Sequence, residues 1–209
     1  QFFLAAQNTI SKATIVSTRN TIAYKTTAVQ HHYLFYQVTM EESNITIGVG
    51  DSIAPISGAA TPAALLFSLS DASTVKRRSK VVVDGSSFAL TEPTWANSVT
   101  VETGLSLISF KADFKGASSM IVENFVVSFN CVTDVCRLVA AGSDASFTEA
   151  SSLRIINCHA TFNNDGRRGT SGNDGVVVKP TLDASTITVE DLTLVFTGSD
   201  PVRYALFFA

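Results

Sequence analysis

The residues that could carry out chemistry are few and mostly far apart in the sequence. Glu123 and Glu190 occupy equivalent places in two copies of an internal repeat, and Ile156 takes that place in the copy between them. Two strand spacings would separate the carboxylates by about 10 Å, which leaves an inverting glycosidase pair open. Solvent-facing glutamates beside a corner explain the pattern better, so we assign no catalytic residue.

Metal-binding and nucleotide-binding patterns are missing from the sequence. His31 and His32 are adjacent and His159 is isolated, and none has a Cys or His at a ligand spacing. The carboxylates between residues 165 and 174 do not follow the calcium-loop pattern. There is no GxxxxGK[ST] motif, and no GxGxxG motif follows a strand. We therefore expect neither a metal nor a cofactor.

The three cysteines and a single sequon suggest two covalent modifications. Cys131 and Cys136 are spaced to bridge a loop, whereas Cys158 lies in an apolar arm and is expected to be a buried free thiol. Asn44 begins the only Asn-X-Thr sequon. Asn44 is therefore the candidate glycosylation site, provided that the chain is exported.

A ten-residue unit with two apolar arms recurs along the chain. The clearest copies are Met120–Phe129, Leu153–Phe162 and Ile187–Phe196. Weaker copies are Ile15–Tyr24, Ile45–Ile53, Val81–Leu90 and Val99–Phe110. In the clear copies the arms meet at a polar pair whose second member is Asn124, Asn157 or Asp191. Asn and Asp tolerate the left-handed backbone that a sharp corner requires, so each unit predicts two strands at an angle.

The composition and spacing of these units predict an all-β fold. The arms are rich in Val, Ile, Thr and Phe, which favour strands. Steps of 18 to 36 residues between copies fit the coils of a solenoid with extruded loops. We predict a right-handed parallel β-helix (β-solenoid) of roughly seven coils. It forms one domain over residues 1–209, with extruded loops near 51–62, 91–97 and 163–175.

A second recurring strand supports the solenoid. Short apolar runs occur at Phe3–Ala6, Tyr33–Tyr36, Ala64–Phe67, Cys136–Ala140, Val176–Val178 and Ala205–Phe208. Each of the first five precedes a ten-residue unit, and the last would open the next coil. If the coils lie over one another, the closing residue of each unit joins an internal column. Its predicted members are Tyr24, Leu90, Phe110, Phe129, Phe162 and Phe196.

Size and charge exclude some classes of protein. The 209 residues are 45% hydrophobic, which is enough for a substantial core. Only 16% are charged, with a formal net charge of −3, which argues against a nucleic-acid-binding protein. No apolar run approaches 18 residues, so we expect no membrane span. Both ends carry strand patterns without polar caps, so we expect a segment of a longer array or copies that stack end to end.

The chain resembles the β-solenoid surface proteins of parasitic protists, in particular the dispersed gene family of large kinetoplastid surface proteins. The resemblance rests on Arg19-Asn20-Thr21, Ile156-Asn157-Cys158 and the closing Tyr204-Ala205-Leu206-Phe207-Phe208. It implies a large exported glycoprotein with many coils, an extracellular or cell-surface location, and an adhesive or matrix role. No catalytic residue carries over from the family.

Three functions are compatible with this sequence. The first is a non-enzymatic structural or adhesive solenoid that binds itself, a glycan or a surface protein. The second is a carbohydrate-active or carbohydrate-binding β-helix, with a ligand-contact loop made of Trp95, Asp165, Arg167, Arg168 and Asp174. The third is a jelly-roll coat subunit, which requires antiparallel strands. A row of aromatic and acidic residues on the outer face would favour sugar binding, whereas Ser, Thr and Lys would favour a scaffold.

Overall fold

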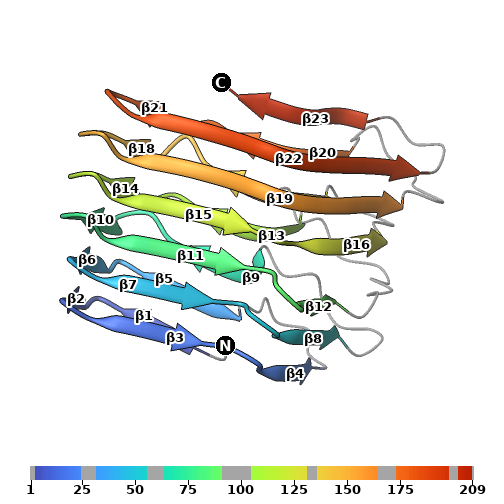
Figure 1. Ribbon diagram of the computed structural model, residues 1–209, viewed down its shortest axis with the longest axis horizontal. Coiled ribbons are helices and arrows are strands. Elements are labelled where there is room, and N and C mark those ends of the chain that lie inside the picture. The colour runs from blue at the N-terminus through green and yellow to red at the C-terminus, as the bar shows by residue number, and fades with distance from the viewer. Residues whose placement is uncertain are drawn as a thin grey trace.

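The computed structural model describes residues 3–24, 32–55, 64–90, 105–130, 136–163, 173–197 and 202–208 (Figure 1). These residues form strands and short corners and contain no helix, so none that could cross a membrane. The chain passes repeatedly through the same series of sheets. Each passage, here called a tier, lies on the previous one, with the N-terminal and C-terminal tiers at opposite ends of the stack (Figure 1).

Six tiers are complete in the described residues. Tier 1 is β1 (Phe3–Ala6), β2 (Thr9–Ser11), β3 (Thr14–Ser17) and β4 (Thr21–Tyr24). Tier 2 is β5 (Tyr33–Tyr36), β6 (Thr39–Glu41), β7 (Asn44–Ile47) and β8 (Ser52–Pro55). Tier 3 is β9 (Ala64–Leu69), β10 (Thr74–Lys76), β11 (Lys80–Asp84) and β12 (Ala89–Leu90).

The later tiers lengthen and finally merge the last two strands. Tier 4 is β13 (Leu105–Phe110), β14 (Asp113–Phe114), β15 (Ser119–Glu123) and β16 (Val126–Asn130). Tier 5 is β17 (Cys136–Ala141), β18 (Ser146–Phe147) and β19 (Ser152–Asn163). Tier 6 is β20 (Asn173–Val178), β21 (Thr181–Leu182) and β22 (Thr186–Thr197), and β23 (Val202–Phe208) lies on β20.

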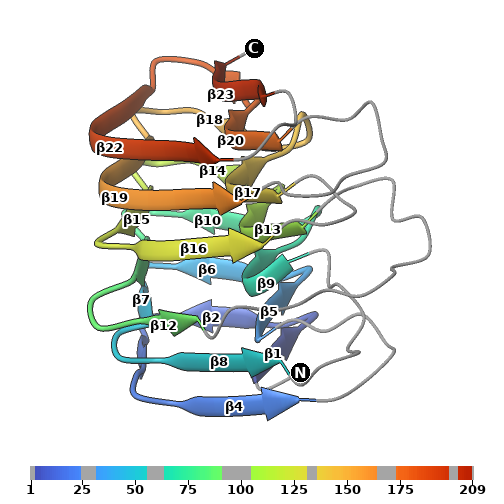
Figure 2. The same cartoon turned by 90° about the vertical axis from the view of Figure 1, so that its right-hand side faces the viewer.

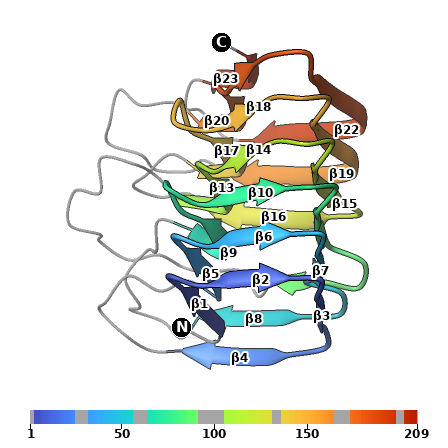
Figure 3. The same ribbon diagram turned by 90° about the vertical axis from the view of Figure 1, so that its left-hand side faces the viewer.

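The tiers build four parallel sheets. The first sheet has the order β1-β5-β9-β13-β17-β20-β23, and the second, seen in Figure 3, has the order β2-β6-β10-β14-β18-β21. The third runs from β3 through β7, β11 and β15 to β19, which also pairs with β16 and β22. The fourth contains β4, β8 and β12 (Figure 2). Every strand pair among the described residues is parallel, which confirms the β-solenoid and makes the jelly-roll prediction wrong.

The second recurring strand of the sequence is the first sheet. The six predicted runs lie within β1, β5, β9, β17, β20 and β23. The unit at Val99–Phe110 is wrong, because Leu105–Phe110 is β13 and pairs with β9 and β17 in this same sheet. Residues 99–104 lie outside the described residues. The units that begin at Val81 and Met120 are therefore separated by one long tier, rather than by two short ones.

The loop boundaries predicted from the sequence need a similar correction. Residues 52–55 form β8, and residues 173–175 belong to β20, so both are part of sheets. The remaining residues of the predicted loops near 51–62 and 163–175 lie outside the described residues, apart from Asp51 and Asn163. The predicted loop at 91–97 lies entirely outside them. Apolar strands bounded by Gly and Pro are easily taken for loops when they are only four residues long.

The predicted aromatic column forms only in tiers 4 to 6. Phe129, Phe162 and Phe196 are in register on β16, β19 and β22. Their rings stack at centroid distances of 5.1 and 4.9 Å, with interplanar angles of 14° and 13°. Phe129 and Phe162 are fully buried, and Phe196 packs against the core while partly exposed. Each ring therefore covers the next along the axis of the stack.

The other three predicted members lie elsewhere. Phe110 belongs to the first sheet, where it pairs with Leu69 and Ala141. Leu90 pairs with Ile53 on β8, and Tyr24 is opposite Pro55, two positions further along that strand. The column prediction is wrong for Phe110 because its apolar run belongs to another sheet. It is wrong for Tyr24 and Leu90 because tiers 1 to 3 turn the corner with a different number of residues.

The predicted polar corner forms a ladder along the stack. Asn124, Asn157 and Asp191 have φ values of 61°, 50° and 50°, in the left-handed region that Asn and Asp tolerate. Asn157 Nδ2 donates to Asn124 Oδ1 at 2.9 Å, and Asn124 Nδ2 donates to Asp84 Oδ1 at 3.1 Å. The corner side chains thus connect successive tiers.

A second ladder, of buried serines, joins the corners between the second and third sheets. The backbone N–H of Ser43 donates to Ser79 Oγ at 3.1 Å, Ser79 donates likewise to Ser118 Oγ at 3.1 Å, and Ser118 to Ser151 Oγ at 3.2 Å. Each of the four serines is 1% exposed. Because a buried N–H without an acceptor is costly, these hydroxyls keep the corner backbone satisfied where no strand pairing reaches it.

Candidate functional site

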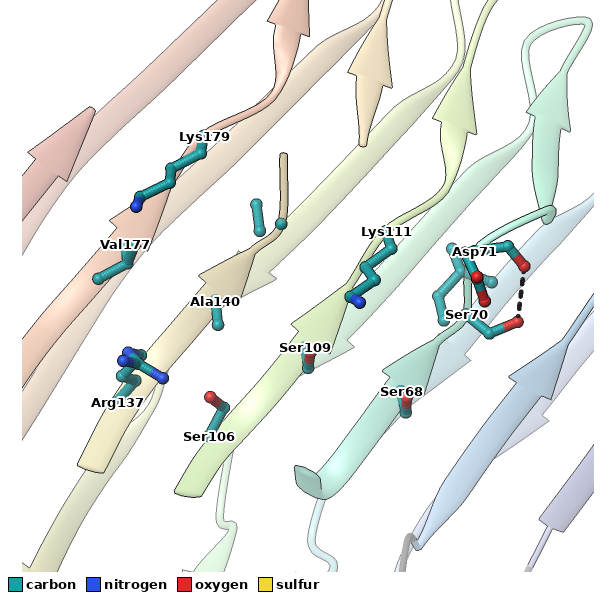
Figure 4. Close-up of a pocket in the computed structure, with 13 residues that line it drawn as sticks. Ser68, Ser70, Asp71, Ser106, Ser109, Lys111, Arg137, Ala140, Val177 and Lys179 are labelled. Carbon is teal, nitrogen blue, oxygen red and sulfur yellow. Dashed lines mark hydrogen bonds between the residues drawn. The ribbon is translucent and has the colours of Figure 1, made fainter. Parts of the chain in front are cut away.

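The first sheet carries an open depression on its outer face. Its floor is a column of outward-facing residues, one from each strand, that are in register across the sheet: Ser68, Ser109, Ala140 and Val177. All four side chains are short. The depression, here called the trough, has a volume of about 430 Å³ and is lined by residues of β9, β13, β17 and β20 and the turns that follow them (Figure 4).

Polar side chains flank this floor on two sides. Lys111 and Lys179 lie at the ends of β13 and β20, beyond the floor residues, and Ser106 and Arg137 lie towards the starts of β13 and β17 (Figure 4). Asp71 lies at the tier 3 end, where its carbonyl accepts the Ser70 hydroxyl at 3.0 Å. The trough therefore runs across the strands, along the axis of the stack.

Arg137 is held by a buried carboxylate. Its Nε and Nη2 donate to Asp174 Oδ2 at 3.1 and 2.9 Å, and Asp174 is fully buried. A buried acid that receives two charge-assisted hydrogen bonds fixes the guanidinium in place. Asp174 was predicted as part of a ligand-contact loop, but it lies on β20 and orients a residue of the trough instead.

Lys111 is placed by the backbone below it. A Cβ on Gly142 would lie 3.1 Å from Lys111 Cγ, so the lysine stem lies over this glycine. Its Nζ is 3.7 Å from Asp144 Oδ2, and both side chains are more than half exposed. Exposed pairs of this kind contribute little stability and are easily exchanged for another anion.

The trough provides hydroxyls and cations but no arrangement for acid–base catalysis. Among the described residues that line it, the one carboxylate is that of Asp71, which is exposed. Asp174 does not line the trough and is buried against Arg137. Within the described parts of the chain there is no group of three or more His, Cys, Asp and Glu residues that could hold a metal ion. The arrangement is suited to binding an anionic or hydroxylated ligand.

A separate polar cluster lies inside the solenoid between tiers 1 and 2. Tyr33 OH donates to Asp51 Oδ2 at 2.7 Å, and the Ser17 hydroxyl lies 3.1 Å from the same phenol oxygen. Asp51 Oδ1 accepts the backbone N–H and the Nδ2 of Asn20 at 2.8 and 3.0 Å. Tyr33 and Asp51 are fully buried, so the cluster is closed to a substrate.

Ionisation within this cluster is strongly perturbed. Burial lowers the pKa of His32 to about 4, against the opposing effect of Asp51. Burial also raises the pKa of Tyr33 well above its usual range, and hydrogen bonding to Asp51 acts in the same direction. His32 contacts Tyr33 edge to face at a centroid distance of 5.0 Å. The cluster holds a neutral imidazole and a neutral phenol beside a carboxylate, which is a structural role rather than a catalytic one.

The remaining predicted site residues are scattered. Glu123 and Glu190 do occupy equivalent positions on β15 and β22, with Ile156 between them. Asn44 is exposed at the start of β7, where the outer face leaves its amide accessible. Trp95, Asp165, Arg167 and Arg168 lie outside the described residues.

The cysteines differ in state. Cys136 is disulfide-bonded, and Cys131 lies outside the described residues. Cys158 is free and buried, as the sequence predicts. Burial raises its pKa to about 11, so the thiol is unreactive at neutral pH.

Sequence reasoning missed both the trough and the polar cluster. The trough is built from short residues at one position of four tiers, and Leu105–Phe110 had been assigned to another sheet. The cluster joins Tyr33 of the first sheet to residues at the corners of the third, which no spacing in the sequence reveals. The serine ladder did have a signal, because a serine stands two residues before the first inward-facing residue of β7, β11, β15, β19 and β22.

Comparison of the chain with protein-family models, curated proteins and solved structures found no match. The resemblance to the kinetoplastid dispersed gene family stays a prediction from the sequence.

Proposed function

We propose that this chain is a non-enzymatic structural or adhesive solenoid whose working part is its long outer surface. The observation that carries the proposal is the repetition of like side chains up the stack, inside and outside. Stacked rings, asparagines and serines connect the tiers. A stack whose tiers are joined by such ladders gives a stiff rod, since each tier is stabilised by its neighbours.

The outer face supports the same proposal. One outward column of the second sheet is Thr9, Thr39, Thr74, Asp113, Ser146 and Thr181. One of the third sheet is Thr14, Asn44, Lys80, Ser119, Ser152 and Thr186. These columns contain hydroxyls and isolated charges, and none of the residues named is aromatic. Ser, Thr and Lys on the outer face are what we expect of a scaffold.

An activity screen tests the non-enzymatic part of the proposal. The chain is incubated with neutral and acidic polysaccharides, and polymer length is followed by size-exclusion chromatography. We expect every polymer to keep its length. Depolymerisation that is lost on changing Glu123 and Glu190 to Gln would contradict the proposal and favour an inverting pair.

Association of the last tier with a further tier, either of a second copy or of a longer chain, is part of the proposed role. At tier 6 and β23, Leu182, Leu206 and Phe208 are 48%, 45% and 45% exposed. Inward-facing residues of β22, such as Ile187 and Leu194, are only partly covered. A further tier would cover these side chains and pair with the edges of β22 and β23. Negative-stain images and light scattering are expected to show filaments at raised concentration, and dispersed monomers alone would contradict this.

Carbohydrate binding is a second candidate. Hydroxyls and isolated charges on an open face indicate a scaffold, but the trough gathers three cations around a hollow and therefore favours an acidic polymer. An elongated depression across parallel strands suits a linear polymer, and serine hydroxyls and basic side chains suit its polar groups. Binding of a polysaccharide without cleavage is compatible with an adhesive scaffold.

Secretion of the protein and glycosylation at Asn44 belong to the same proposal. A mass shift on glycosidase treatment of the protein from its native source would test them.

A further inference from the structure

We propose that the trough binds a linear acidic polysaccharide, with the acidic groups of the polymer paired to Lys111 and Lys179. This inference rests on the adhesive role proposed above and specifies the chemistry of the partner. The carboxylates of uronic acids and the sulfate esters of sulfated glycans share the chemistry that these lysines recognise.

The spacing of the two lysines fits a repeating polymer. Lys111 follows Phe110 and Lys179 follows Val178, and these two residues are linked through Ala141 in the register of the first sheet. The lysines are therefore two tiers apart on the same side of the trough. Two strand spacings correspond to about 10 Å. A polymer lying along the stack axis can then place successive acidic groups against successive cations.

The floor of the trough favours an acidic sugar over a neutral one. Ser68, Ser109 and Ala140 leave room for a chain to lie flat, and the hydroxyls can exchange hydrogen bonds with those of the sugar. No aromatic side chain lines the trough in the described part of the molecule. Without a ring on which a pyranose can stack, the affinity must come from charge and hydrogen bonds, and these discriminate in favour of an anionic polymer.

The sheet itself disfavours an acidic peptide. β9, β13, β17 and β20 each pair with a strand on both sides, so their backbone groups are already hydrogen-bonded. A peptide cannot add to this face as an extra strand, which is the mode that gives extended peptides their affinity on a sheet. The ligand must be recognised through side chains alone.

Charge also gives the trough a direction. Lys111, Arg137 and Lys179 line the trough in tiers 4 to 6, whereas Asp71 lines its tier 3 end. Asp144 Oδ2 lies 3.7 Å from Lys111 Nζ, but Asp144 is not part of the lining, so the cations outnumber the acids over the upper tiers. An acidic polymer is attracted over the upper tiers and repelled at Asp71. We therefore expect Asp71→Asn to strengthen binding, by about twofold, since a single exposed charge contributes little.

The test measures binding of polygalacturonate and dextran sulfate to the whole chain by isothermal titration calorimetry at low ionic strength. Neutral dextran and poly-glutamate serve as comparison polymers. We expect at least one acidic polysaccharide to bind, with binding weakened by salt. The double variant Lys111→Gln/Lys179→Gln should lose about tenfold or more in affinity, because two charge-assisted contacts are removed.

A matched control removes the same charge from another face. Lys12→Gln/Lys80→Gln changes two exposed lysines of tiers 1 and 3, away from the trough. This variant should retain affinity to within about twofold, as expected for distant exposed charges. A second trough variant, Ser109→Gln, fills the floor without a change in charge and should also weaken binding. Circular dichroism and thermal melting confirm that each variant is folded.

Several results would overturn the inference. These are no binding of either acidic polymer, equal losses in the two lysine double variants, or equal affinity for poly-glutamate. Binding of polygalacturonate alone identifies carboxylates as the recognised group, and binding of dextran sulfate alone identifies sulfates. Cleavage of a polymer that still depends on Lys111 and Lys179 for binding would support the trough and contradict the non-enzymatic proposal, so the two can fail separately.

Discussion

Tiers 1 to 3 and tiers 4 to 6 share one architecture but turn the corner after the third sheet in different ways. In the first three tiers the corner takes residues 18–20, 48–51 and 85–88, and a separate fourth sheet follows. In the later tiers it narrows until β19 and β22 run through it as single strands of 12 residues (Figure 2). A single left-handed Asn or Asp therefore replaces a longer turn.

The interior changes together with the corner. Beside the long corners lies the buried cluster of Tyr33 and Asp51, and beside the narrow ones lie the stacked rings of Phe129 and Phe162. The buried carboxylate of Asp51 is tolerated because the backbone N–H and the side-chain amide of Asn20, at the tier 1 corner, donate to it. The comparison shows that a solenoid can keep its register while a buried hydrogen-bonded cluster beside the corner gives way to stacked rings.

The largest expected effect on the free energy of unfolding lies in tiers 4 to 6, the half of the stack that contains the stacked rings. Phe162→Ala removes a fully buried ring that stacks on both neighbours. Its cost should be about 3–5 kcal/mol in the free energy of unfolding, measured with urea. Thr161→Ala, on the outward side of the same strand, should cost less than about 0.5 kcal/mol. Similar losses in the two variants would mean that the rings do not stabilise the upper tiers.

The next largest effect is expected where tier 3 meets tier 4, at Gly85 and Phe125. A Cβ on Gly85 would lie 2.5 Å from Phe125 Cγ, so Gly85→Ala should cost about 1–3 kcal/mol by overpacking. Gly142→Ala is the matched control, since its Cβ would meet the flexible stem of Lys111 at 3.1 Å. The control should change the free energy of unfolding little. If Gly85→Ala were equally neutral in urea melts, Phe125 would not be pressed against the corner of tier 3.

The buried polar cluster between tiers 1 and 2 should lose stability when a single hydroxyl is removed. Tyr33→Phe removes the donor to Asp51 Oδ2 and leaves a buried carboxylate oxygen with one partner fewer. The expected loss is about 1–2 kcal/mol, measured by thermal or urea unfolding. Tyr36→Phe, at an exposed position of the same strand, should be neutral. A Tyr33→Phe protein as stable as the parent would show that the cluster is not needed in tiers 1 and 2.

The free energy of unfolding is also expected to depend on pH. The pKa of His32 is about 4 in the folded chain and near 6.5 when unfolded, so the unfolded chain binds the proton first. Stability from the neutral imidazole is fully present above pH 6.5 and is lost as the pH falls towards 4. His32→Gln should flatten this part of the stability–pH curve, whereas His159→Gln, at an exposed site, should leave it unchanged. An identical slope in both variants would contradict the assignment.

The sequence predicts tiers 4 to 6, the upper half of the stack, better than tiers 1 to 3, the lower half. Ile, Val and Phe at fixed distances from Asn124, Asn157 and Asp191 reveal the strands, the corner and the ring stack, because each tier repeats the same spacing. In tiers 1 to 3 the corner after the third sheet varies in length. Tyr24 and Leu90 therefore close equivalent units of the sequence repeat but pair with different residues of β8. Phe110 was misplaced because an apolar run does not show which sheet it joins. The trough depends on side chains from four tiers, and only the register of the first sheet brings them together.

The measurement that tests the central claim most directly is disulfide cross-linking of engineered cysteines on the outward column Ser128, Thr161 and Val195. Adjacent tiers place paired Cα atoms about 4.8 Å apart, within the range of a disulfide, whereas alternate tiers place them about 10 Å apart. We predict that Thr161→Cys/Val195→Cys forms the bond under mild oxidation and Ser128→Cys/Val195→Cys does not. Efficient bridging of the second pair, or none of the first, would contradict the in-register stacking of the tiers.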